Sequence, residues 1–338
     1  MDRALPAFAP PGAAAAGLSL TRPEIWAAAS LVAVCFLACV AAPLAAYLAA
    51  IALFGLAHVG AELRFVDRAF AGRLPKMLVV GIAAPLAVAF AARLAGQLGM
   101  AAPSLTVPLE LASGAVMACV AATAMRQRRL FGAALAAALV AGAVFAPYET
   151  FLLLAIGHNF TPLAFIADGA PASRRRSLLL WLCLPFVVLP LIIASGLPGA
   201  AFEAIGLFAP EAGPMAAGPL DAHLPVYVPA RLLDSQWALP LFSACVFAQT
   251  MHYATVIHLL PRLVGEGPRA TLAPWPRRSV FLLSLAACAA ALAGLFLADY
   301  GLARKIYALA ALVHSWIEIP ILIWALDRSA IAAAADGR

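Results

Sequence analysis

The sequence predicts an all-α, polytopic membrane protein: a helical bundle of about ten transmembrane helices with both termini in the cytoplasm. Three observations predict this class, namely the composition, the length of the apolar segments and the placement of the basic residues. Of the 338 residues, 65% are hydrophobic and 11% are charged, and the mean hydropathy is +0.97. Soluble domains carry about 25% charged residues, and disordered chains combine low hydrophobicity with high charge. Both of these classes are therefore excluded.

Ten segments are long and apolar enough to cross the hydrocarbon core, which takes about 20 residues of helix. None has the ten-residue alternation that is typical of strands in a membrane barrel. Ala and Gly are frequent in these segments and allow helices to approach closely in lipid. The predicted spans are roughly 24–41, 44–66, 76–98, 106–125, 130–147, 149–168, 177–195, 237–262, 278–299 and 301–327.

These spans form a single predicted transmembrane domain, residues 24–327, which includes an outer loop over 196–236. A connection of this length is typically a lid, a re-entrant segment or a disordered insert. Residues 1–23 are rich in Pro and Ala and lack the pattern of a cleaved signal peptide. We expect them to form a flexible cytoplasmic tail, and residues 328–338 to form a second one.

The basic residues predict the orientation of the bundle. Of the 22 Lys and Arg residues, 18 fall on the side of the N-terminal tail and four on the other side. Since positively charged loops stay in the cytoplasm, both termini are predicted to be cytoplasmic, in an integral protein of the bacterial inner (cytoplasmic) membrane. The basic clusters are interpreted as topology signals and contacts for anionic membrane lipids, and no nucleic-acid partner is expected.

Four of the six histidines lie inside predicted spans that all run from the outside to the inside: His58, His158, His252 and His314. They stand about 8–13 residues from the cytoplasmic ends of these spans, which corresponds to depths of about 12–20 Å. Ionisable groups at such depths usually mark a site, and imidazole is the commonest nitrogen ligand of metals. The sequence therefore predicts a shared metal or haem site. The alternative is four separate histidines, each hydrogen-bonded to a neighbouring helix.

Two of these histidines are each followed by a glutamate one helical turn later, Glu62 after His58 and Glu318 after His314. A carboxylate on the same helix face as its histidine has two open roles. It is either a direct ligand, giving a dinuclear centre of four His and two Glu, or an acceptor that orients a ligating histidine. For Glu62 a third alternative is an ion pair with a nearby arginine.

Other polar residues surround the four histidines. His258 is a further candidate ligand, or it extends toward the cytoplasm. Tyr253 and Asn159 are candidates for positioning oxygen or substrate. His223, in the outer loop, is expected to be an ordinary surface histidine rather than a ligand.

One histidine on each of four membrane helices resembles the Brp/Blh carotenoid dioxygenases. The segment 58–62, His-Val-Gly-Ala-Glu, is similar to the His-Gly-x-x-acid element of that family, with one extra residue between His and Gly. The segments 157–159, 249–253 and 314–318 would supply the other three histidines. The resemblance implies a four-histidine iron and cleavage of a carotenoid such as β-carotene.

The leading hypothesis is a membrane-embedded non-haem iron oxygenase that acts on a lipid-soluble small molecule, carotenoid-like or another hydrophobic chain. The four histidines would hold one or two irons, and the assigned catalytic residues are Glu62, Glu318, Tyr253 and Asn159. The electron donor is not identified by the sequence. The alternatives are a b-type cytochrome, in which haem is the cofactor, a proton-coupled transporter with a His/Glu relay, and an assembly factor that carries a metal.

Overall fold

The computed structural model describes residues 21–125, 128–213, 215–265 and 270–335, with side chains to residue 327, and this part of the chain contains helices and no strand. The expected N-terminal tail, apart from its last three residues, lies outside the described residues. The α-helices are α2 Arg22–Ala41, α3 Pro43–Ala49, α4 Gly55–Phe70, α5 Lys76–Gln97, α6 Pro103–Ala124, α7 Arg129–Phe145, α8 Pro147–His158, α9 Thr161–Gly169, α10 Ala172–Cys183, α11 Leu189–Ala194, α12 Leu197–Ala204, α13 Ala238–His258, α14 Leu260–Val264, α15 Arg278–Ala298 and α16 Tyr300–Ala335.

Within these ranges seven helical segments are long and apolar enough to cross a membrane, or eight if the bent pair α8–α9 counts as one span. The protein is thus a helical membrane bundle. Two predicted spans account for the rest of the difference from ten. The helix α7 has 17 residues, and α13 has polar residues, among them Gln249 and His252, along its 21 residues.

The sixth predicted span, 149–168, is broken directly after His158, where α8 and α9 meet at 47°. Proline explains the break, because Pro162 has no N–H to donate to the carbonyl four residues earlier. That carbonyl belongs to His158, and it accepts a hydrogen bond from Thr161 Oγ1 instead, at 2.9 Å. His158 therefore lies at the end of a helix rather than inside one.

The second predicted span is continuous but contains a π-helical turn, Ala50–Phe54, between α3 and α4. Such turns are rare and are frequent at functional sites. This one ends four residues before His58. Directly after it, Gly55 leaves room for the ring of Tyr307, because a Cβ atom at Gly55 would lie 2.8 Å from the Tyr307 Cε2 atom.

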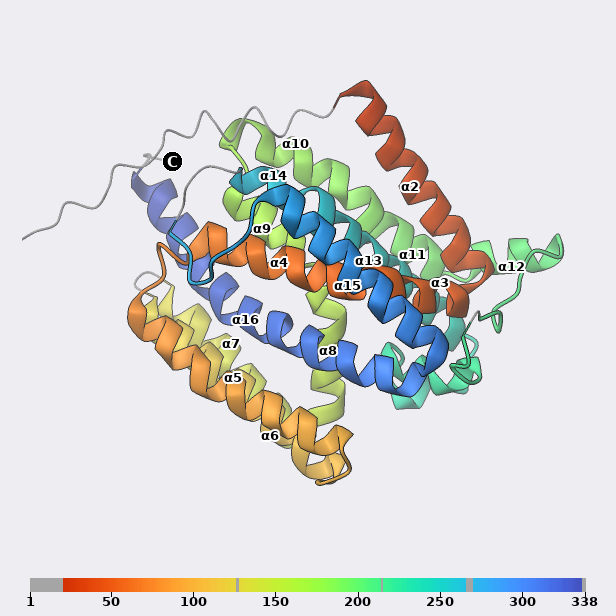
Figure 1. The fold of residues 1–338 in the computed structure, drawn as a ribbon, viewed down its shortest axis with the longest axis horizontal. Helices are drawn as coiled ribbons and strands as arrows, with labels where there is room; N and C mark the ends of the chain where they lie inside the picture. The colour runs from red at the N-terminus through yellow and green to blue at the C-terminus, as the bar shows by residue number, and fades with distance from the viewer. Residues whose placement is uncertain (1–20, 126–127, 214, 266–269, 336–338) are drawn as a thin grey trace, which may run out of the picture.

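The long helix α16 lies between α4 and the flank formed by α5 and α6, and contacts all three (Figure 1). It fits against α6 at Gly114, where a Cβ atom would lie 2.0 Å from the Trp316 ring. Trp316 Nε1 also donates a 2.9 Å hydrogen bond to Glu110, one turn away on α6. These two contacts fix the rotation of α16 and hence the direction of its histidine.

The predicted outer segment, between α11 and α13, folds over one end of the bundle with α12 and short 3-10 turns (Figure 1). Leu224 and Tyr227 of this segment are buried in a hydrophobic cluster with residues of α3 and α13. The prediction that His223 lies on the surface is wrong, since it is 0% exposed. Its Nε2 donates to Ala217 O at 3.0 Å, and its Nδ1 accepts from the Tyr300 hydroxyl at 3.3 Å.

Candidate metal centre

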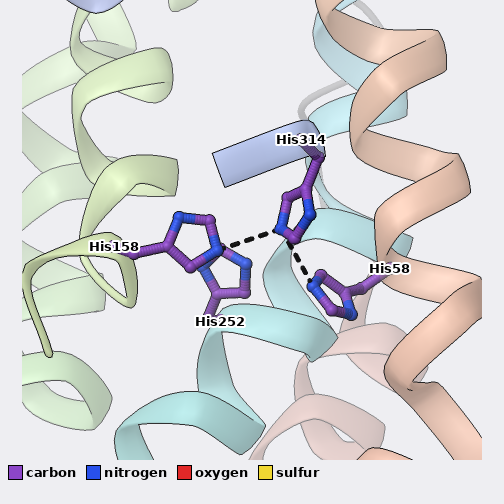
Figure 2. A group of neighbouring side chains, drawn as sticks. All are labelled: His58, His158, His252 and His314. Atoms are coloured by element: carbon purple, nitrogen blue, oxygen red, sulfur yellow. Dashed lines mark hydrogen bonds between the residues drawn. The ribbon is translucent and has the colours of Figure 1, made fainter. Parts of the chain in front are cut away.

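Four histidines meet in the interior of the bundle, as the sequence predicts (Figure 2). His58 comes from α4, His158 from the end of α8, His252 from α13 and His314 from α16. Three of them are at most 1% exposed, and the side chain of His158 is 18% exposed. One ring nitrogen of each lies within 4.8 Å of one ring nitrogen of every other.

The spacing of these nitrogens suits a single metal ion. His314 Nε2 lies 3.2 Å from His58 Nε2 and 3.0 Å from His158 Nε2. Nitrogen ligands about 2.0–2.1 Å from an ion stand about 3.0–3.4 Å from one another when they are neighbours around it. The cluster could therefore hold an ion without large movement of the rings. Imidazole donors suit zinc, copper, iron and nickel.

Neighbouring groups orient the ring of His58. Its Nδ1 donates to the carbonyl of Phe54, at 3.3 Å, at the end of the π-helical turn. The ring of Tyr253 stacks on the His58 ring with centroids 3.9 Å apart. With Nδ1 carrying the proton, Nε2 keeps its lone pair for a metal, which is the usual arrangement of a ligating histidine.

The two glutamates occupy different places around the cluster. Glu62 Oε2 lies 3.4 Å from His252 Nε2 and 3.9 Å from His314 Nε2, so Glu62 stands beside the converging nitrogens. Glu318 Oε2 lies 3.0 Å from His158 Nδ1, the nitrogen on the other side of that ring. Glu62 is thus placed as a further ligand and Glu318 as the group that orients His158.

Burial makes these carboxylates unusual. All four oxygens of Glu62 and Glu318 are buried, and ring nitrogens of His158, His252 and His314 lie 3.0–3.9 Å from them. Burying a carboxylate without compensation is costly, and a cation removes that cost. Together with His158 and His314, the two carboxylates form a second group whose ligand atoms all lie within 4.8 Å. The residues present therefore fit one metal ion and offer ligands for a second.

A cavity of about 390 Å³ adjoins the centre. His58, His158 and His314 form part of its wall, and most of the rest of the lining is apolar. This volume is within the usual range of ligand pockets, about 300–1,000 Å³. A small molecule in the cavity would thus lie next to the histidine cluster.

Three polar side chains of the cavity wall form a hydrogen-bonded chain beside His58. Gln249 Nε2 donates to the Tyr253 hydroxyl at 2.6 Å, and the hydroxyls of Tyr253 and Tyr307 are 2.5 Å apart. Asn159 also lines the cavity, and its Nδ2 donates to Ala155 O at 3.4 Å. The structure thus brings the two predicted positioning residues, Tyr253 and Asn159, to the cavity.

Among the candidate ligands, His258 does not join the cluster. It is exposed at the end of α13, six residues beyond His252 and therefore on another side of the helix. The sequence analysis also missed residues of the cavity wall, chiefly Tyr307 and the ion pair of Arg93 with Glu110. A charge inside each of two apolar spans was the signal that could have found that pair.

Comparisons with protein-family models, curated proteins and solved structures find no match. The function is therefore inferred from the chemistry of the site.

Proposed function

We propose that the chain is a membrane-embedded non-haem iron oxygenase whose substrate is a lipid-soluble molecule, carotenoid-like or another hydrophobic chain. The observation that carries the proposal is the convergence of four imidazoles on one point beside a largely apolar cavity. The resemblance of the four histidine segments to the Brp/Blh dioxygenases also supports iron as the metal and a polyene as the substrate.

His58, His158, His252 and His314 would hold the iron, with Glu62 as a further ligand. Iron at this centre would supply the binding of dioxygen and the redox chemistry of substrate oxidation. Glu318 orients His158. The stacked ring of Tyr253 holds His58 in place, and the hydroxyls of Tyr253 and Tyr307 offer a hydrogen-bond donor at the cavity wall.

The apolar cavity wall suits a substrate that reaches the site from the lipid without crossing water. Exclusion of water also limits side reactions of activated oxygen. Leu153 on α8 lines the cavity and is 69% exposed on the surface of the bundle. We therefore infer that substrate enters sideways past α8.

For the topology we propose ten spans, with α7, the bent pair α8–α9, and α13 added to the seven long apolar helices. This number keeps 18 of 22 basic residues on one side and places both termini in the cytoplasm of a bacterial cell, with the protein in its inner membrane. With ten spans, the outer segment that carries His223 faces away from the cytoplasm.

A proton-coupled transporter is the second candidate, favoured by the buried carboxylates of Glu62 and Glu318. A relay of His and Glu at mid-membrane is typical of such carriers. A b-type cytochrome fits less well, because a haem held by two of these imidazoles needs space between them. His314 Nε2 lies only 3.2 Å from His58 Nε2 and 3.0 Å from His158 Nε2.

The test is dioxygen uptake by the iron-loaded, detergent-purified protein with lipid-soluble polyenes, namely β-carotene and a hydroxylated carotenoid side by side. We expect uptake that depends on iron and is lost in His252→Ala. If metal-free proteoliposomes instead show substrate or proton flux, and the protein takes up no oxygen, the transporter becomes the better proposal.

A further inference from the structure

Arg93 and Glu110 form an ion pair inside the membrane domain, from α5 and α6. Arg93 Nε and Nη2 each donate a 2.8 Å hydrogen bond to one oxygen of the Glu110 carboxylate. Trp316 Nε1 donates to the same carboxylate at 2.9 Å. The Glu110 side chain is 2% exposed and that of Arg93 25%. Charges in such a position are expensive and usually serve a function.

This ion pair belongs to the wall of the cavity at the histidine cluster, because Arg93, Glu110 and Trp316 all line it. The lining along α16 extends from Arg304 to Ile319, a length of about 22 Å at the helical rise. The cavity is therefore elongated along α16, with His314 partway along it.

The pair offers hydrogen-bond donors without net charge. A guanidinium group has five N–H donors, and Glu110 accepts two of them, which leaves three for other acceptors. Glu110 neutralises the positive charge of Arg93 at close range. A neutral oxygen atom of a ligand is therefore a better partner at this point than an anion.

Two of the tyrosines in the cavity wall have the same preference. The hydroxyls of Tyr253 and Tyr307 share one hydrogen bond, which uses one of their two protons. Gln249 also donates to Tyr253. One hydroxyl proton thus remains for a further acceptor, so the tyrosine pair can donate to an oxygen atom in the cavity.

We propose that the cavity binds an elongated, lipid-soluble molecule that carries a neutral oxygen, a hydroxyl or a carbonyl, and that Arg93 donates a hydrogen bond to this oxygen. The apolar remainder of the molecule lies along α16 beside the histidines. This inference rests on the proposed function only where it identifies the bound molecule as the substrate of the oxygenase. A pure hydrocarbon would leave the donors of Arg93 without an acceptor, which is costly in an apolar site.

The test compares binding of tritiated hexadecane, hexadecan-1-ol and hexadecanoate to the metal-loaded protein in detergent micelles. We expect the alcohol to bind about tenfold more tightly than the alkane, the effect of one hydrogen bond to a charged group, and more tightly than the carboxylate. In Arg93→Met/Glu110→Met, which removes both charges together, the preference for the alcohol should disappear. Lys305→Met, an exposed cation on α16, is the control and should bind as the wild type does.

Metal content and unfolding temperature show whether the double variant folds. If it does not fold, Arg93→Lys replaces it, and the preference should fall because the fork of donors is lost. Equal binding of alkane and alcohol, tighter binding of the carboxylate, or no binding of any probe to the wild type would overturn the proposal. So would a preference that survives in the folded double variant. Oxygen uptake tests the proposed function separately, since the alcohol can bind to a protein that is no oxygenase.

Discussion

The Nδ1 atom of His158 lies 3.0 Å from the Oε2 atom of Glu318. The other nitrogen of the same ring, Nε2, lies 3.0 Å from His314 Nε2 in the centre of the cluster. Since His314 and Glu318 are one turn apart on α16, this helix supplies one candidate ligand and orients a second. The arrangement matches metal sites in which a carboxylate behind a histidine fixes its tautomer and direction.

Glu318→Gln is expected to weaken metal binding without abolishing it. The amide keeps the size of the side chain but loses the charge that fixes the proton on His158 Nδ1, and loss of such partners costs about 10–100-fold in metal affinity. Titration with a competing chelator measures this. Glu203→Gln, at an exposed carboxylate on α12, is the control. If the metal affinity of Glu318→Gln is unchanged, Glu318 does not orient His158 for metal binding.

His158→Ala is expected to lose most of the bound metal, because the ring contributes Nε2 to the cluster although it lies at a helix break. The matched control is His258→Ala, which removes an exposed histidine outside the cluster and should retain full metal content. Elemental analysis of the purified variants decides this. If His158→Ala retains its full metal content, His158 is not a metal ligand.

Gly114→Ala should destabilise the protein by about 1–3 kcal/mol, the usual cost of overpacking. The new Cβ atom would lie 2.0 Å from the Trp316 ring, so Trp316 must move and lose its hydrogen bond to Glu110. Gly294→Ala on α15 is the control, because its Cβ would meet nothing within 4 Å. In denaturant unfolding in detergent, Gly294→Ala should leave the free energy of unfolding unchanged or raise it slightly. Equal stabilities would contradict the packing role of Gly114.

Tyr307→Phe should lower the rate of oxygenation about tenfold while metal content stays at the wild-type level. The hydroxyl bonded to Tyr253 is lost, which removes a donor worth about one ordinary hydrogen bond. Single-turnover measurements with saturating substrate isolate this effect. A loss of metal in this variant would instead indicate that the tyrosine pair serves to hold His58.

The outer segment should loosen in acid. Burial lowers the pKa of His223 below its ordinary value of 6.5, because removal from water disfavours the charged ring. The nearby positive charge of Arg304 also lowers this pKa, and the hydrogen bond to Ala217 O opposes the shift only in part. A histidine with a lowered pKa binds fewer protons in the folded state, so it stabilises the fold above pH 6.5 and less as the pH falls below that value.

Hydrogen exchange of residues 217–228 measures this effect between pH 5 and 8. His223→Gln is the matched variant, since a neutral amide can donate and accept in place of the ring without titrating in this range. We expect exchange in the wild type to rise more in acid than the intrinsic rate explains, and exchange in the variant to follow the intrinsic rate. The same excess in both proteins would assign the effect to another group.

The sequence predicted the class of fold and the histidine cluster because both depend on simple regularities. Apolar length identifies most spans, and the similar depths of His58, His158, His252 and His314 along co-oriented helices predicted their meeting. The break after His158 was missed because the apolar character of 149–168 continues through Pro162, although the missing N–H of proline ends the helix there.

Side-chain partners across helices were harder to predict. The separate positions of Glu62 and Glu318 depend on the rotation of α4 and α16, which the fit of Trp316 against Gly114 helps to fix. A pattern of residues on one helix does not contain that rotation. The burial of His223 likewise depends on how the outer segment folds against Tyr300, which its composition does not reveal.

The central claim is that four histidines hold iron, and metal analysis with an absorption spectrum tests it most directly. The measurement compares detergent-purified protein, produced with iron supplied, with the double variant His58→Ala/His252→Ala. We predict about one or two irons per chain, as the number of ligands in the cluster allows, no Soret band, and loss of the iron in the variant. A Soret band, or a wild-type protein without metal, would contradict the claim.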